Sequence, residues 1–393
     1  MEQVSYQRTE TTIHPVSVGF AFNVGLDNVT DMYGNGTDMF GNVTITPPII
    51  VPQLTFLECF EIFWLVVIGI CGVVGNSTLI YSVLLNSEMR SVPNLLIANV
   101  AVGDLLVLLL NVPLTILSYV KPSFLLGEMM CKLVTFLPVV SEGVSVFTFT
   151  ALSFDRYKAI VRPMQRRRRP VVRRTCLVAI CIWLFAICFG LPSIFLAYLS
   201  YDYPPLVLCF NLPHFTLQAR IYEVMRCLIM YVIPLSVITC YYCLIAIQLF
   251  RSSRDMPGEG HQESKQARAR RRLAKAVLVL VFIFGFCWFP HFLRSLWFQF
   301  GHNELLFLRP GMMIFQTISL FLVYFNCSAN PIALCFLSRT YRQYFVRYLC
   351  CKHGAAFVTG KKVTFPMNPS HTKNSEMDGS IRTSSAETKT CTV

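Results

Sequence analysis

Charged residues are scarce in this chain. They make up 14% of its 393 residues, whereas a soluble globular protein carries about a quarter. Hydrophobic residues reach 54%, and the mean hydropathy is +0.54. This balance excludes an ordinary soluble domain and favours a protein embedded in a membrane.

The sequence also lacks the marks of several other classes of protein. Residues 1–20 contain no apolar core, so we expect no cleavable signal peptide, and the first membrane span serves as the insertion signal. No nucleophile–base pair and no metal-ligand cluster is visible, so the sequence does not indicate an enzyme. A channel would need a polar lining. A secondary transporter, the rival class, would usually show repeated halves with paired broken helices.

Long apolar runs are what the chain does have. Each run holds the roughly 20 apolar residues that a spanning helix needs. Helices rather than strands follow because every backbone polar group must be satisfied inside the segment. The runs differ from one another, which argues against a transporter. The sequence therefore predicts an all-α membrane protein, a seven-transmembrane helix bundle over residues 58–337, with spans at about 58–85, 93–120, 130–157, 174–199, 222–249, 273–300 and 310–336.

The formal charge of +13 is concentrated in alternate connections between the spans. Basic clusters such as Arg166 to Arg169 and Arg270 to Arg272 fall on one side of this topology, while the other connections hold few basic residues. The positive-inside rule then places the N-terminus outside and the C-terminus in the cytoplasm of a multi-pass plasma-membrane protein. Because the clusters follow the membrane topology, they do not indicate nucleic acid as a partner.

Residues 1–57 are predicted to form an extracellular, glycosylated N-terminal tail. Asn28, Asn35 and Asn42 each begin an Asn-x-Thr sequon in the repeat NVTDMYG-NGTDMFG-NVT. Three sequons in one polar tail support one another. The alternative is a low-complexity tail that contains the sequons by chance.

Two parts are predicted after the last span: a short helix and then a disordered tail. Residues 338–351 favour a short amphipathic helix on the inner membrane surface, because basic and aromatic residues alternate there at helical spacing. Cys350 and Cys351 at its end are candidates for palmitoylation. Residues 352–393 are rich in Ser and Thr, and we expect a disordered cytoplasmic tail that is open to phosphorylation. A plain solvated end is the alternative.

The third span and several prolines give the bundle its long axis and its hinges. A helix from Cys131 to Arg156 is roughly 38 Å long and exceeds the bilayer core of about 30 Å, so its ends lie at opposite membrane faces. Pro234, Pro290 and Pro331 fall inside the fifth, sixth and seventh spans. Prolines at such positions kink helices and create hinges where the bundle can change shape.

One motif stands in each span: Asn76, Asp104, Asp155-Arg156-Tyr157, Trp183, Pro234, Cys287 to Pro290, and Asn330-Pro331. In this order they resemble the signature of the rhodopsin-like (class A) G-protein-coupled receptors, over about residues 58–351. The stretch 143–164, GVSVFTFTALSFDRYKAIVRPM, is similar to the bombesin and gastrin-releasing-peptide receptors. The stretches 253–260 and 266–279 are similar to the invertebrate CCHamide neuropeptide receptors.

The resemblance implies a peptide receptor that signals through a heterotrimeric G protein of the calcium-mobilising Gq class, with arrestin binding the phosphorylated tail. It implies a disulfide between Cys131 and Cys209. At the inner end, Asp155 would hold Arg156 at rest, and Arg156 would contact the G protein; a surface ion pair is the alternative. The residues implied in G-protein coupling are Asp155, Arg156, Tyr157, Pro163, Met164 and Tyr242. Those implied in switching are Phe284, Trp288, Pro290, Asn330 and Pro331.

The only cofactor that the resemblance implies is a sodium ion. Asp104, Ser145, Asn326 and Asn330 match the family's buried sodium pocket. A hard cation prefers oxygen ligands and would offset the cost of a carboxylate inside the membrane. The alternative is a protonated Asp104 that is hydrogen-bonded to Asn330 without a metal. Cys327 is a departure, because the family usually carries serine at that position.

The ligand pocket is expected in the outer half of the bundle, where polar residues are few. Any of these residues can instead pair with another, for example Glu142 with Arg226. Pro138 and Leu320 stand where bombesin receptors carry glutamine and arginine, so a peptide other than bombesin is expected. The last span contains no lysine to hold retinal, and Pro138 replaces the aspartate that binds amines. The candidate pocket residues are Pro138, Glu142, Glu223, Arg226, His291, Arg294 and Gln316.

Overall fold

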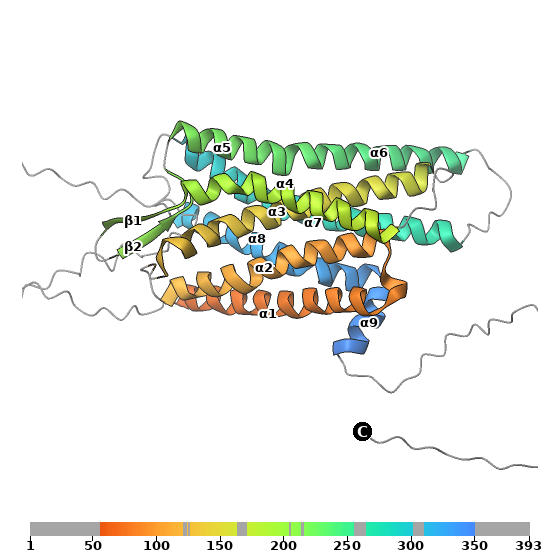
Figure 1. The fold of residues 1–393 in the computed structure, drawn as a ribbon, viewed down its shortest axis with the longest axis horizontal. Coiled ribbons are helices and arrows are strands. Elements are labelled where there is room, and N and C mark those ends of the chain that lie inside the picture. The colour runs from red at the N-terminus through yellow and green to blue at the C-terminus, as the bar shows by residue number, and fades with distance from the viewer. Residues whose placement is uncertain are drawn as a thin grey trace, which may run out of the picture. The chain divides into compact units, whose positions relative to one another are not determined.

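The helices lie side by side as a bundle (Figure 1). The computed structural model describes residues 56–120, 124, 126–162, 171–203, 206–213, 216–254, 265–301 and 310–349. In these residues, 7 helical segments are long and apolar enough to cross a membrane, as the sequence predicts. They are α1 (Phe56–Leu85), α2 (Val92–Val120), α3 (Gly127–Val161), α4 (Val171–Leu196), the continuous segment α5 (Leu217–Cys227), η5 (Leu228–Val232) and α6 (Ile233–Arg254), α7 (Lys265–Phe300), and α8 (Pro310–Leu337).

Short elements mark the two ends of the bundle. Strands β1 (Tyr198–Tyr203) and β2 (Leu206–Phe210) pair antiparallel between α4 and α5, and we call their end of the bundle the hairpin end. Helix α9 (Arg339–Leu349) lies at the other end (Figure 1), which we call the α9 end; a single 3-10 turn, η3 (Ser87–Met89), joins α1 to α2. The sequence did not predict the strands, because their first residues continue the fourth apolar run. The helix expected over 174–199 ends at Leu196 instead.

Helix α3 is the central element of the bundle. It packs against α2, α4, α6 and α7, and its side chains Phe149 and Leu152 are 1% and 0% exposed. A polar chain ties three helices together at mid-bundle: Trp183 Nε1 of α4 donates to Asn99 Oδ1 of α2, and Asn99 Nδ2 donates to Thr148 Oγ1 of α3, at 2.9 and 3.0 Å. These bonds satisfy polar groups that face the bundle interior, where water cannot do so.

Helix α1 approaches α8 closely because glycine faces α8. A Cβ atom on Gly75 would lie 2.7 Å from Pro331 Cγ, and one on Gly72 would lie 2.5 Å from Ser328 Oγ. At this contact Asn76 Nδ2 donates to the Cys327 carbonyl at 2.8 Å. Asn76 thus satisfies a backbone carbonyl next to the residues proposed to surround Asp104, and the first and seventh spans are held in register.

Helix α9 confirms the amphipathic helix predicted after the last span. Tyr341 and Phe345 are buried on one face, while Arg339 and Arg342 are exposed. Asn86 Nδ2 donates to Tyr348 Oη at 2.9 Å and so connects the end of α1 to α9. Several predictions lie outside the described residues: the sequons at Asn28, Asn35 and Asn42, the coupling residues Pro163 and Met164, the palmitoylation candidates Cys350 and Cys351, and the tail 352–393.

Candidate functional site

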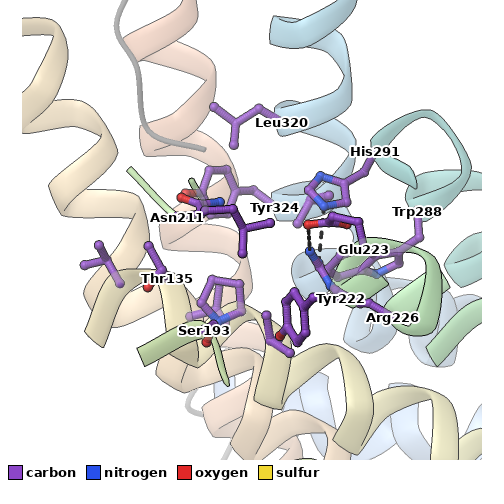
Figure 2. A pocket seen from close by; sticks show the side chains of 16 residues that line it. Thr135, Ser193, Asn211, Tyr222, Glu223, Arg226, Trp288, His291, Leu320 and Tyr324 are labelled. Atoms are coloured by element: carbon purple, nitrogen blue, oxygen red, sulfur yellow. Dashed lines mark hydrogen bonds and ion pairs between the residues drawn. The ribbon is translucent and has the colours of Figure 1, made fainter. Parts of the chain in front are cut away.

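A pocket opens between the helices near the hairpin end. It encloses about 670 Å³ of space, part of which is open to solvent. Asn211 and Leu212, which follow β2, line it together with residues of α2, α3, α4, α5, α7 and α8. In Figure 2, Glu223, Arg226 and His291 gather on one side of this pocket, with Thr135 and Ser193 on the other side of the view. The pocket is therefore apolar in most of its lining and strongly polar at one place.

Most of the residues predicted for a ligand pocket gather here. Glu142 lies against the pocket and lines a smaller cavity that adjoins it. Arg294 and Gln316, although both are described, are not among the residues that line either cavity. The pocket itself is lined by Pro138, Glu223, Arg226 and His291.

Arg226 is the centre of a buried charged cluster. Its Nη2 and Nε atoms donate to Glu142 Oε2 at 2.8 and 3.1 Å, and Nη1 lies 3.6 Å from Glu223 Oε1. His291 Nε2 lies 3.2 Å from Nη2. Glu142, Glu223 and Arg226 are 1%, 3% and 6% exposed. A charge removed from water to this extent persists only when it is paired, so the pairing of Glu142 with Arg226 that the sequence left open is present.

The local helix geometry explains why these side chains meet. Thr216 accepts a hydrogen bond from the backbone N–H of Ala219 and so caps the start of α5. Glu223 and Arg226 are three residues apart and share one face of α5. The π-helical turn η5 follows directly, and such turns change the direction in which the residues beside them face. On α3, Glu142 lies one turn beyond Pro138, also on one face.

A disulfide holds the hairpin over the pocket. The bond joins Cys131 at the start of α3 to Cys209 in β2, as the family resemblance implies, and both cysteines are fully buried. Phe124 donates its backbone N–H to the Val207 carbonyl at 2.7 Å, a second tie between the hairpin and the chain that leads into α3. Because Asn211 lies two residues after Cys209, the disulfide places it in the pocket wall.

Sequence reasoning missed several polar residues of the pocket. Asn211 could have been found from its closeness to Cys209, and Tyr324 from its position four residues after Leu320 on α8. Tyr324 Oη lies 2.7 Å from Thr115 Oγ1 of α2. Thr135, Ser193 and Tyr222 gave no signal, because the rotation of α3, α4 and α5 about their axes cannot be read from their apolar sequences.

Aromatic rings connect the pocket to the middle of the bundle. Trp288 is 3% exposed and lines both cavities. Its ring centroid lies 5.3 Å from that of His291 and 5.9 Å from that of Phe284, whose ring lies 5.9 Å from Phe149 of α3. The predicted switch residues Phe284 and Trp288 thus form a continuous contact from His291 of the charged cluster to α3. Both precede Pro290, whereas His291 follows it, so the contact crosses the point where proline kinks the helix.

The residues around Asp104 offer oxygen atoms to a cation. Asn330 Nδ2 donates to Asp104 Oδ2 at 2.8 Å, so the hydrogen bond of the metal-free alternative is present. Asp104 Oδ1, Ser145 Oγ, Asn326 Oδ1 and Asn330 Oδ1 are nevertheless buried without a hydrogen-bond partner in the described part of the chain. Buried oxygens are rarely left unpaired in native proteins, and such a set fits a hard cation.

At the α9 end, Arg156 pairs with the neighbouring Asp155. Arg156 is 7% exposed. The alternative given for this pair, an ion pair on the protein surface, therefore does not fit, because the arginine is buried. Tyr157 lies next to it and packs against Tyr241 of α6, with ring centroids 5.5 Å apart. Arg156 is therefore held inward, between helices, in this structure.

Two hydrogen bonds tie α7 to its neighbours at the same end. Tyr242 Oη of α6 donates to the Ala274 carbonyl at 2.8 Å, and Arg270 Nη1 donates to the Ala159 carbonyl of α3 at 3.2 Å. Both bonds end on backbone carbonyls, so they join the helices without a partner carboxylate. While they persist, α3, α6 and α7 stay together around Arg156.

The sequence of the chain matches a known protein family and two known proteins. The model of a family described as "7 transmembrane receptor (rhodopsin family)" matches residues 75–333. The chain is 37% identical over 311 residues to bombesin receptor subtype-3 of Ovis aries, which covers 77% of this chain and 78% of the relative. It is 34% identical over 309 residues to a bombesin receptor of Bombina orientalis, with 77% and 79% covered.

Proposed function

Because the chain belongs to the rhodopsin family of seven-transmembrane receptors, in its bombesin-receptor-like group, we propose that it is a receptor for a neuropeptide. The observation that carries the proposal is the pocket at the hairpin end, which has a buried charged cluster in an otherwise apolar lining. Few, well-placed polar groups in an apolar cavity are typical of ligand sites. The family consists of receptors, so the expectation that the chain is no enzyme is confirmed, and the transporter alternative is excluded.

The proposed ligand is a CCHamide-like or bombesin-like peptide, with a different peptide of the same size as the alternative. The similarity to two bombesin receptors supports the peptide class. The proposal of a CCHamide-like peptide rests on the resemblance of 253–260 and 266–279. Pro138 and Leu320 both line the pocket, at positions where bombesin receptors carry polar side chains, and this favours a ligand other than bombesin.

We propose that the signal passes from the pocket along α7 to the α9 end. A peptide that contacts Arg226 and His291 shifts the ring of Trp288, which touches His291. Movement there bends α7 at Pro290 and breaks the bonds from Tyr242 and Arg270 that hold its other end. Arg156 then becomes accessible to a heterotrimeric G protein of the Gq class. Arrestin would later bind the phosphorylated tail, residues 352–393.

The remaining proposals concern the membrane and the ion. The chain is a multi-pass membrane protein, and we place it in the plasma membrane with the hairpin end outside and the α9 end in the cytoplasm. In that orientation Asn28, Asn35 and Asn42 are available for glycosylation, and Cys350 and Cys351 for palmitoylation. Asp104, Ser145, Asn326 and Asn330 would hold a sodium ion, which would balance the charge of the buried carboxylate.

A peptide screen in cells tests the proposed function. Cells that express the chain with a surface tag are exposed to CCHamide-like peptides, bombesin and unrelated peptides, while intracellular calcium is recorded. We expect a calcium rise with CCHamide-like peptides, a weaker one or none with bombesin, and none in untransfected cells. Normal surface expression together with silence toward the CCHamide-like peptides would contradict the assignment of ligand, and a response to another peptide of the panel would identify the alternative.

A further inference from the structure

A second, smaller cavity lies between the pocket and the residues around Asp104. Its lining shares Pro138 and Trp288 with the larger pocket, so the two spaces are neighbours. Its other side is formed by Ser145 and Asn326, two of the residues expected to hold sodium. Cys327, which follows Asn326 on α8, also lines it. The cavity therefore adjoins the larger pocket and is also lined by two of the residues expected to hold sodium together with Asp104.

Three buried oxygen atoms belong to residues that line this cavity and lack a hydrogen-bond partner among the described residues. They are Glu142 Oε1, Ser145 Oγ and Asn326 Oδ1. The three side chains are 1%, 1% and 2% exposed. Glu142 and Ser145 are three residues apart on α3 and share one face of it. A small cation, which prefers oxygen ligands, would satisfy all three acceptors. Trp288 Nε1, a donor on the same lining, is unpaired as well.

The two carboxylate oxygens of Glu142 differ in their contacts. Both Nε and Nη2 of Arg226 bind Oε2, which leaves Oε1 unpaired. Glu223, the second carboxylate beside Arg226, lines the larger pocket and is not among the residues that line the small cavity. The two glutamates therefore differ in one respect that an experiment can use, because only Glu142 lines the small cavity.

We propose that Glu142 is a further acidic ligand of the buried sodium site, acting through Oε1 in the small cavity. Glu142 would then hold the ion together with Ser145 and Asn326, which line the same cavity, and with Asp104. This inference rests on the sodium site proposed above and adds to it a carboxylate that is paired with Arg226 of the larger pocket. Because Arg226 binds the same carboxylate, the occupancy of the pocket and that of the ion site are linked through one side chain.

The thermal unfolding temperature of the purified full-length chain tests this inference without any peptide or G protein. It is measured while NaCl replaces choline chloride at constant ionic strength. Wild-type protein should be stabilised by sodium in a saturable way, and Asp104→Asn should remove the effect. Arg226→Gln should lower the half-saturating sodium concentration, because it removes a positive charge that shares the Glu142 carboxylate.

Two double variants of equal charge provide the decisive comparison. Glu142→Gln and Glu223→Gln are each combined with Arg226→Gln, so both proteins lack one glutamate and the arginine. The variant without Glu142 should need at least about tenfold more sodium for half-saturation than the variant without Glu223, since losing even a residue that only orients a metal ligand typically costs about 10–100-fold in affinity. Equal half-saturation in the two double variants would overturn the inference, and so would a wild-type protein that responds equally to sodium and choline. Neither result bears on the peptide screen, which decides the receptor function separately.

Discussion

Arg226→Ala is expected to have the largest effect of any single substitution in the pocket. Removing the guanidinium leaves Glu142 and Glu223 buried at 1% and 3% exposure without the arginine that binds both. Breaking a buried ion pair in this way typically costs about 3–5 kcal/mol. The variant should therefore unfold at a markedly lower temperature than wild type, and binding of the active peptide should fall with it. Thermal unfolding of the purified receptor and radioligand binding on intact cells measure the two effects.

A nearby arginine provides the matched control. Arg220 lies on the same helix, donates to the Gln299 carbonyl at 2.9 Å and stacks its guanidinium on Phe300 at 5.7 Å. Arg220→Ala removes the hydrogen bond to the Gln299 carbonyl without leaving a carboxylate unpaired. The substitution should therefore lower the free energy of unfolding by only about 1 kcal/mol. Equal destabilisation by the two substitutions would contradict the account of the Arg226 cluster. Adding Glu142→Gln to Arg226→Gln should restore part of the lost stability, because it removes one unpaired charge.

Arg156→Ala is expected to separate signalling from binding. Arg156 lies at the α9 end of α3, whereas the pocket lies at the hairpin end, so the peptide should bind with unchanged affinity. Its guanidinium is held inward beside Asp155, and its loss removes the group proposed to contact the G protein. A hydrogen bond to a charged group is worth about 1.5–3 kcal/mol, so coupling should weaken by about tenfold or more. Calcium responses and ligand binding on the same cells measure the two properties.

Lys158→Ala is the control for that experiment. Lys158 lies two residues further along α3, is exposed, and places its Nζ 4.1 Å from the ring centroid of Phe154. Removing an exposed cation–π contact should cost about 0.5–1 kcal/mol and leave the calcium response close to wild type. Full signalling by Arg156→Ala, at equal surface expression, would show that this arginine is not needed for coupling.

The spans could be predicted from the sequence because membrane insertion depends mainly on run length and hydropathy. The predicted run 93–120 and the helix Val92–Val120 agree within one residue. The interruption of the fifth span by η5 could not be predicted, since Leu228–Val232 lies inside the predicted apolar run and contains neither glycine nor proline. The strands could not be predicted because the first residues of β1 continue the fourth apolar run, and the disulfide from Cys209 to Cys131 that holds β2 against α3 is a contact between distant residues.

The site was only partly predictable because the rotation of each helix decides which polar residues meet. Glu142 and Arg226 are 84 residues apart, and the sequence offered their pairing only as one alternative among several. Arg294 was expected in the pocket from its position on the same helix as His291, yet it is absent from the lining that the structure describes. Glu61, 4% exposed on α1, drew no attention because a single carboxylate does not interrupt the apolar run.

The central claim is that a peptide bound at the hairpin end activates a G protein at the α9 end. Its most direct test is guanine-nucleotide exchange on a purified Gq heterotrimer by the full-length chain in lipid discs, with the peptide that the calcium screen identifies. We expect the peptide to accelerate exchange with the wild-type chain and to accelerate it by at least about tenfold less with Arg156→Ala, although both proteins bind it. Bound peptide without faster exchange by the wild-type chain would contradict the account.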